Sequence, residues 1–326
     1  MSSVLSYGKR AVKKALRVCT GSTILYKTNW YKSKFVGADH EVYPDNIWYR
    51  SHAERNYFIV NLGSSGGKWA FDYAGTGVKG MVWAQQPQTL SADFQLLRHY
   101  HSILRKGGYV AITIMPFTGL NKQTDVWDAM RYLKLETQGE PIETHLLDEA
   151  RRYSETPIMM GRSAVKTLIK YLLGKDKPTV NTLAYLDHNT MDDAQLQKDA
   201  DRWMNGWKRQ FSIEDFEAPL TAQNQKGREY RINLMRTIID FCRERDYQPV
   251  WVIPPVTAFL AAHFTPMFRQ LYIYDYLKQV DRDIPLLDYS NEQSLMDKDL
   301  YFNSFFLNSK GRKLFTCRVL KDLQLI

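Results

Sequence analysis

The sequence has few cysteines and no long apolar run, and both absences restrict what the protein can be. The three cysteines, Cys19, Cys242 and Cys317, are too widely spaced for a disulfide framework or a metal site. A reducing compartment is therefore expected. No apolar stretch reaches the roughly 18 residues of a membrane span, and the N-terminus has no uninterrupted apolar core typical of a signal peptide. We expect a cytoplasmic protein without a metal or cofactor.

Negative charge is missing from one part of the chain. Residues 1–34 contain eight Lys or Arg and no Asp or Glu. On a helical wheel, residues 4–19 place apolar side chains on one half and five cations on the other. Such a helix either contacts anionic lipid at the inner membrane surface or packs on the domain with its lysines in water. No nucleic-acid partner is expected, because no aromatic residues alternate with the cations and no known motif occurs.

The remaining composition is that of an ordinary folded protein. Apolar residues make up 44% of the chain and charged residues 24%, both typical of globular domains. The length of 326 residues suffices for one large domain or two small ones. Aromatic residues reach 13%, with tyrosine the commonest. This content suits a half-polar groove that faces a glycan, and it suits a plain core equally.

Apolar, β-rich runs alternate with helical patterns along most of the chain. The alternation predicts a three-layer α/β fold, an open and mainly parallel sheet with helices on both faces. Such sheets bind ligands at the carboxyl ends of their strands. The strands are expected at residues 56–62, 79–84, 109–117, 249–256 and 284–290, and the longest helices at 89–106, 221–246 and 308–323.

Residues 118–220 interrupt this alternation. They are charged, contain scattered tryptophans and show broken helical patterns near 124–135, 143–153, 162–173 and 193–208. We therefore expect a helical insertion at 118–220 in an α/β domain of residues 51–326, preceded by a basic arm of residues 1–50.

A glycine-rich turn, Gly63-Ser64-Ser65-Gly66-Gly67-Lys68, follows the first predicted strand. A phosphate-binding loop would need Gly at the position of Leu62 and Ser or Thr at the position of Trp69, so nucleotide triphosphate binding is not expected. A serine at a strand tip beside a helix can act as a nucleophile. Serine is also a leading helix cap, and the turn alone favours that structural role.

The turn resembles the first block of the SGNH/GDSL hydrolase superfamily when it is read together with "NSFFLNSKG", residues 303–311. That superfamily includes bacterial carbohydrate esterases and glycan O-acyltransferases. The stretch "GMVWAQQPQTLSADFQLLRHYHSILRKGG" is similar to SGNH-like proteins of bacterial capsular or exopolysaccharide gene clusters. The resemblance covers residues 55–117 and 221–326. It implies Ser65 as nucleophile, Gly63 and Ser64 as its turn, and Gly75 or Gly77 as oxyanion glycine.

The last block departs from the family pattern, in which an Asp and a His stand where this chain has Asn303 and Phe306, although Asn308 is retained. Phenylalanine accepts no proton, so it cannot act as a general base. Asp72, Asp93 and Asp288 are available carboxylates. Asp288, at the end of the fifth predicted strand, is the best placed of them, either for catalysis or as a turn cap. The candidates for a replacement base are His52, His99, His101, His145, His188 and His263.

Two main functions remain open from the sequence. One is a serine-dependent glycan O-acyl esterase or acyltransferase that uses Ser65. The other is an inactive SGNH-like protein that binds a glycan, a lipid-linked saccharide or a biosynthetic protein. A transferase site within residues 118–220 is a third, without a motif to support it. The first two require the Ser65 turn and the loop before the last helix to meet at one pocket.

Overall fold

The computed structural model describes residues 22–32, 55–84, 88–118, 120, 144–177 and 191–326. The chain divides into two compact units. One comprises residues 1–53 and 125–182, and the other comprises residues 54–124 and 183–326. The described residues 191–220, which the sequence places in the helical insertion, therefore belong to the same unit as the sheet.

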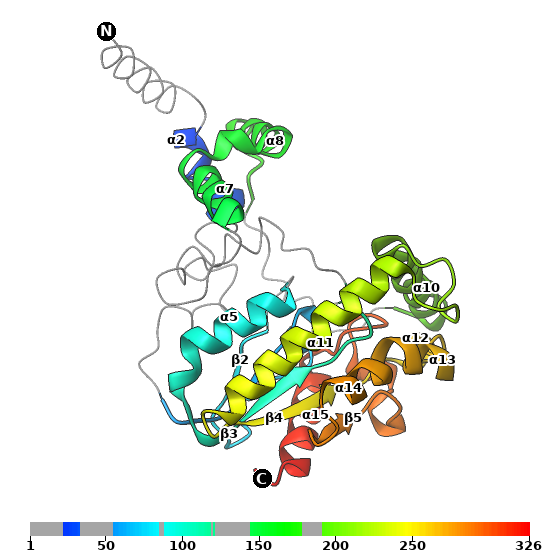
Figure 1. The fold of residues 1–326 in the computed structure, drawn as a ribbon. Helices are drawn as coiled ribbons and strands as arrows, with labels where there is room; N and C mark the ends of the chain where they lie inside the picture. Colours follow the sequence, from blue (N-terminus) through cyan, green and yellow to red (C-terminus); the bar gives the residue numbers. More distant parts are fainter. Residues whose placement is uncertain (1–21, 33–54, 85–87, 119, 121–143, 178–190) are drawn as a thin grey trace. The chain divides into compact units, whose positions relative to one another are not determined.

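The larger unit contains a five-stranded sheet in which every strand pair is parallel (Figure 1). All five predicted strands are confirmed, and so is the α/β class. The strand order across the sheet is β2-β1-β3-β4-β5, so the chain passes from β1 to β2 on one side and then returns to β3 on the other side of β1. Open parallel sheets bind ligands at such a switch point, beyond the carboxyl ends of the strands. The strands are β1 (Tyr57–Leu62), β2 (Gly80–Val82), β3 (Leu104–Thr113), β4 (Gln248–Ile253) and β5 (Leu286–Asp288).

Helices cover both faces of this sheet (Figure 1). On one face, Val250 and Val252 of β4 pack with Phe315 and Val319 of α15 (Ser309–Asp322). On the other, α11 (Ala222–Arg243) packs on β4 and contacts α5 (Leu90–Tyr100) and α14 (Asp275–Val280). The central strands are buried on both faces, which explains why their sequences are continuous apolar runs.

The helix predicted at 89–106 is shorter than expected. Helix α5 ends at Tyr100, a single turn η4 (His101–Ile103) follows, and β3 already begins at Leu104. Leu104 pairs with Tyr57 of β1 across an irregularity in the register. Gly107, with φ +70°, accommodates the irregular backbone. Strand pairing thus overrides the helical pattern of this segment.

The smaller unit contains the helices α2 (Ser22–Leu25), α3 (Asn29–Tyr31), α7 (Thr144–Glu155), η5 (Pro157–Met160) and α8 (Arg162–Leu172). The side chain of Asp176 accepts a hydrogen bond from the backbone N–H of Asn29 at 2.9 Å, and the Tyr31 hydroxyl donates to the carbonyl of Ser154 at 3.0 Å. These bonds join residues 29–31 to residues 154 and 176, which are far away in the sequence. The helices predicted near 143–153 and 162–173 are confirmed, whereas those at 4–19 and 124–135 lie outside the described residues.

No helix among the described residues combines the length and apolar character needed to cross a membrane.

Candidate functional site

A pocket lies at the carboxyl edge of the sheet, where the turn after β1 meets the loop before α15. Gly66, Trp69 and Ala70 line it from the segment after β1, Met115 from that after β3, Pro254 and Pro255 from that after β4, and Phe305, Phe306 and Leu307 from the loop before α15. The structure thus brings together the two segments that the SGNH resemblance pairs. The lining is almost entirely apolar.

Glycines allow the turn after β1 to lie close to the sheet. Gly63 has φ +131°, and a Cβ there would lie 3.0 Å from the Cβ of Thr113 on β3. At Gly67, in the short helix α4 (Ser65–Lys68), a Cβ would lie 2.9 Å from the carbonyl oxygen of Leu62. Neither position has room for a side chain. Ser65 is the first residue of α4 and is half-buried beside the pocket.

A buried polar network holds this turn. The Oδ1 atom of Asp93 accepts hydrogen bonds from the backbone N–H of Gly63 at 2.8 Å and from Nε2 of Gln88 at 2.5 Å. The backbone N–H of Gln88 in turn donates to Oγ of Ser64 at 3.1 Å. Asp93 is buried in the first turn of α5. The sequence offers Asp93 as an available carboxylate but favours Asp288 over it, because an Asp in the first turn of a helix is usually a solvated residue near the helix dipole. No local pattern indicates a role for Gln88.

The loop before α15 is fastened by its own polar residues. Oδ1 of Asn303 accepts hydrogen bonds from the backbone N–H groups of Phe305 at 2.9 Å and Phe306 at 2.7 Å. The hydroxyl of Ser304 donates to Oδ2 of Asp199, on α10 (Asp193–Phe211), at 2.7 Å. The backbone carbonyl of Ser304 accepts a hydrogen bond from the hydroxyl of Thr257 at 2.7 Å. Asn303, at the predicted Asp position, therefore shapes the loop.

Asp199 is the charged anchor of this loop. Burial alone would raise the pKa of its carboxyl group, but hydrogen bonds from Ser304 and Arg202 outweigh burial and lower the pKa below the ordinary value. Arg202 forms an ion pair with Asp199 at 2.6 Å. Asp199 is 105 residues from Ser304 in the sequence, so no local pattern indicated this contact.

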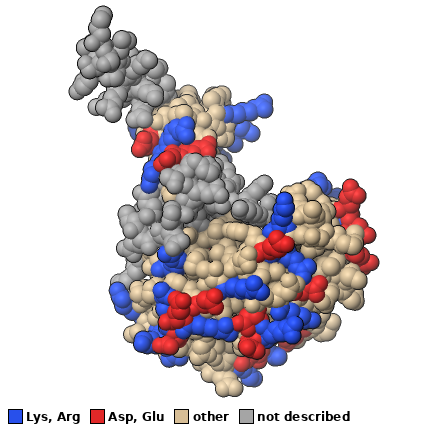
Figure 2. Space-filling model, in the orientation of Figure 1, with Lys and Arg blue, Asp and Glu red and all other residues tan. Residues whose placement is uncertain are grey.

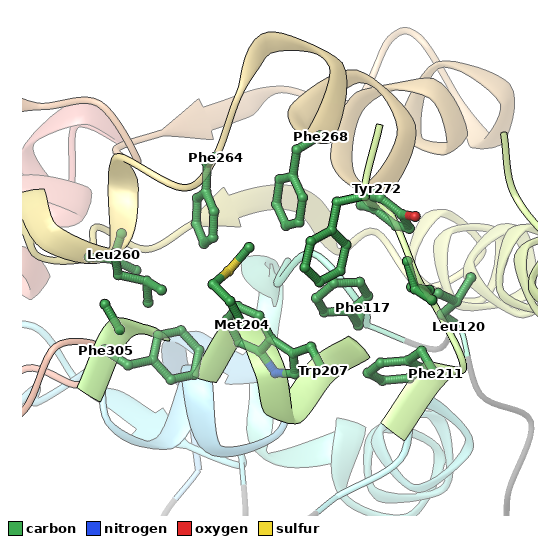
Figure 3. Packing of buried hydrophobic residues seen from close by; sticks show 14 of the residues in the cluster. Phe117, Leu120, Met204, Trp207, Phe211, Leu260, Phe264, Phe268, Tyr272 and Phe305 are labelled. Atoms are coloured by element: carbon green, nitrogen blue, oxygen red, sulfur yellow. The ribbon is translucent and has the colours of Figure 1, made fainter. Parts of the chain in front are cut away.

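Phe306, which the SGNH resemblance aligns with a histidine, is buried in an aromatic cluster formed by α10, the segment after β4 and the loop before α15. Figure 3 shows part of this cluster, including Trp207 of α10 and Phe305 of the loop. Its ring centroid lies 5.5 Å from that of Trp203 and 5.7 Å from that of Phe302. These contacts hold an apolar ring at the position where the SGNH resemblance would place a proton acceptor. The buried aromatic members of the cluster are Trp69, Phe117, Trp207, Phe211, Phe216, Phe264, Phe268, Tyr272, Phe305 and Phe306.

The residues that keep the family pattern in this loop have structural roles. Oδ1 of Asn308 caps α15 by accepting from the N–H of Gly311 at 3.0 Å, and its Nδ2 donates to the carbonyl of Asp299 at 2.8 Å. A Cβ at Gly311 would lie 2.1 Å from the carbonyl oxygen of Leu300. Leu307 is buried against α15 in the core. Each of the three retained residues thus has a role in folding.

The structure does not bring Asp288 to the Ser65 turn. Asp288 ends β5, and β3 and β4 separate β5 from β1, which amounts to about 14 Å at the usual strand spacing. Its carboxylate accepts hydrogen bonds from the hydroxyls of Tyr274 at 2.5 Å and Ser290 at 2.6 Å. These bonds correspond to the turn-capping alternative.

Gly75 also lies away from Ser65. The Tyr73 ring packs on Gly80, the first residue of β2, so that the intervening loop, which contains Gly75, leads into the amino end of β2. The turn after β1 is at the opposite, carboxyl edge. An oxyanion role for Gly75 therefore has no geometric support.

The three histidine side chains that the structure describes have partners elsewhere. Nδ1 of His101 lies 3.1 Å from the hydroxyl of Tyr247, just before β4, and the His99 ring packs against that of Tyr100. Nε2 of His263 lies 3.1 Å from Oδ1 of Asp201 on α10. The remaining candidate bases, His52, His188 and the side chain of His145, lie outside the described part of the chain.

No group of three or more His, Cys, Asp or Glu side chains in the described ranges could hold a metal ion. No family model matches the sequence, and no curated protein matches it.

Proposed function

We propose that this chain is an SGNH-like binding protein that does not catalyse acyl transfer and that serves bacterial surface-polysaccharide biosynthesis in the cytoplasm, beside the inner membrane. One observation carries the proposal. In the loop before α15, residues with a folding role match the family pattern, whereas the positions of the Asp and His hold Asn303 and Phe306.

A protein that lost catalysis but kept its fold would retain the motif residues needed for folding and lose those needed only for catalysis. Leu307, Asn308 and Gly311 are needed to bury and cap α15. Phe306 cannot take a proton from Ser65, and a serine without a base is a weak nucleophile at neutral pH. Removal of one triad member typically costs several orders of magnitude in rate.

The proposed ligand is the saccharide part of a glycan or of a lipid-linked intermediate. Small-molecule pockets are mainly apolar with a few polar groups at their edge. Here Trp69, Phe305 and Phe306, each at most 7% exposed, contribute their rings to the lining, and Ser65 directly precedes the lining residue Gly66. The polysaccharide context comes from the resemblance of residues 80–108.

Calorimetric titration of the protein with acetylated and unacetylated bacterial oligosaccharides tests this proposal. The variant Gly66→Ala would place a Cβ 2.6 Å from the side chain of Met115, a lining residue, and so force that side chain to move. We expect it to weaken binding about tenfold or more. The control Gly206→Ala meets no atom within 4 Å and leaves affinity unchanged. Equal affinities in both variants and the parent would contradict binding at this pocket.

A serine-dependent glycan esterase or acyltransferase is the second candidate. The supporting observation is the turn itself, in which Asp93 and Gln88 hold Gly63 and Ser64, and half-buried Ser65 directly precedes the lining residue Gly66. The base would then come from His52, His145 or His188. Loss of acetate release from acetylated sugars in Ser65→Ala, relative to an active parent protein, would establish this function in place of the first.

A further inference from the structure

Helix α8 of the smaller unit presents an apolar stripe to solvent. Val165, Ile169, Leu172 and Leu173 follow the spacing of one helix face. Their exposed fractions are 47%, 52%, 65% and 63%. The opposite face is the one that packs inward, because Ala164 and Thr167 are buried and α8 contacts α2 and η5.

Such a stripe is unusual on a folded unit. Scattered exposed apolar residues are common, but contiguous apolar surface usually marks an interaction site. Met159, which precedes α8 in η5, is also half exposed, at 52%. The stripe and Met159 together form what we call the α8 face: Met159, Val165, Ile169, Leu172 and Leu173.

The charge around the α8 face identifies the kind of partner. Lysines at 166 and 170 are exposed on the same helix, next to the stripe. Across residues 162–177 there are five cations and one carboxylate, and that carboxylate, Asp176, is bonded to Asn29. Figure 2 shows Lys and Arg atoms (blue) projecting from the α8 end of this unit. The cations of this segment are Arg162, Lys166, Lys170, Lys175 and Lys177.

From these observations we infer that the α8 face docks on an anionic phospholipid surface. An interfacial helix places its apolar stripe among the acyl chains and its lysines among the lipid phosphates. The lysine side chains reach the head groups along their aliphatic stems. Paired apolar and cationic surface fits anionic lipid better than a neutral protein groove. The inference is independent of the proposed pocket ligand.

Co-sedimentation of the full chain with vesicles tests the inference. Vesicles of phosphatidylglycerol and phosphatidylcholine are compared with vesicles of phosphatidylcholine alone. The variant Ile169→Ser/Leu172→Ser/Leu173→Ser removes the centre of the stripe without touching a buried residue. We expect about a tenfold or larger loss of affinity for the anionic vesicles. A matched control, Met267→Ser/Leu286→Ser/Leu314→Ser, removes three exposed apolar residues of the other unit and binds as the parent does.

The basic arm of residues 1–50 is present in all three proteins, so a difference between them reports the α8 face. Equal binding by the parent and the α8 variant would overturn the inference. A parent that is dimeric by light scattering and becomes monomeric in the α8 variant would overturn it in favour of a second copy of this chain. Parent protein that binds neutral and anionic vesicles equally would overturn the electrostatic part.

Discussion

At the scale of single residues, Asp93 is the side chain on which the turn after β1 depends. It accepts the N–H of Gly63 and the amide of Gln88 while 2% exposed. Asp93→Ala leaves both buried donors without this acceptor, and we expect a loss of about 3 kcal/mol in the free energy of unfolding. Asp93→Asn keeps an acceptor oxygen and should lose less. Urea denaturation measures both, and a loss below about 1 kcal/mol for Asp93→Ala would contradict the role.

Asp199 makes the stability of the loop before α15 depend on pH. Its pKa is lowered from 3.8 in the folded protein by Ser304 and Arg202, despite burial. The ionised form therefore stabilises the fold above the ordinary pKa, and this contribution is lost as the pH falls through the lower folded value. The stability difference between the parent and Asp199→Asn should be largest at neutral pH and shrink below about pH 4. Urea midpoints at pH 7 and pH 3 check this, and a constant difference would contradict it.

Some residues of the candidate site could be identified from the sequence, and others could not. Gly63, Ser65 and Phe306 stand in short motifs that can be read directly, and all three lie at or next to the pocket. The roles of Asp93 and Asp199 could not be read this way, because Gly63 and Ser304, whose positions they fix, are 30 and 105 residues away in the sequence. Nothing local distinguishes a buried carboxylate from a solvated one.

At the scale of elements, two helix glycines have opposite consequences. A Cβ at Gly227 of α11 would lie 1.7 Å from the carbonyl oxygen of Leu120, so Gly227→Ala must displace backbone. We expect it to destabilise the protein by about 3 kcal/mol. A Cβ at Gly206 of α10 meets nothing within 4 Å, and Gly206→Ala should stabilise by up to about 1 kcal/mol. Thermal unfolding of the two variants measures these changes. Shifts of the unfolding temperature in the same direction for both variants would contradict the packing described here.

The five strands were predictable because parallel strands buried on both faces are continuous apolar runs. The end of α5 was not, since pairing of Leu104 with Tyr57 favours strand over helix there. The grouping of α10 with the sheet unit could not be read from local pattern either. Helix α10 belongs with the sheet through Asp199 and through rings such as Trp207, which packs 5.2 Å from Phe117, and these contacts span many residues.

At the scale of the whole molecule, the two proposed surfaces belong to different units of the chain. The α8 face lies in the unit of residues 1–53 and 125–182, and the pocket lies in the unit of residues 54–124 and 183–326. Lipid binding through cations should weaken steeply with salt, whereas binding of a neutral saccharide should not. Vesicle co-sedimentation and saccharide titration at about 0.05 M and 0.5 M salt measure the two separately. An equal loss of vesicle binding and saccharide binding at high salt would contradict the assignment of the two ligands to separate surfaces.

The central claim is the proposal that Ser65 is not activated, since no described residue is placed beside it as a proton acceptor. Reaction with a fluorophosphonate tests this claim most directly. This reagent bonds covalently to activated serines, and intact-mass spectrometry detects the adduct. An unmodified protein, indistinguishable from Ser65→Ala after the same incubation, is the predicted result. An adduct that forms on Ser65 and is absent from Ser65→Ala would contradict the claim.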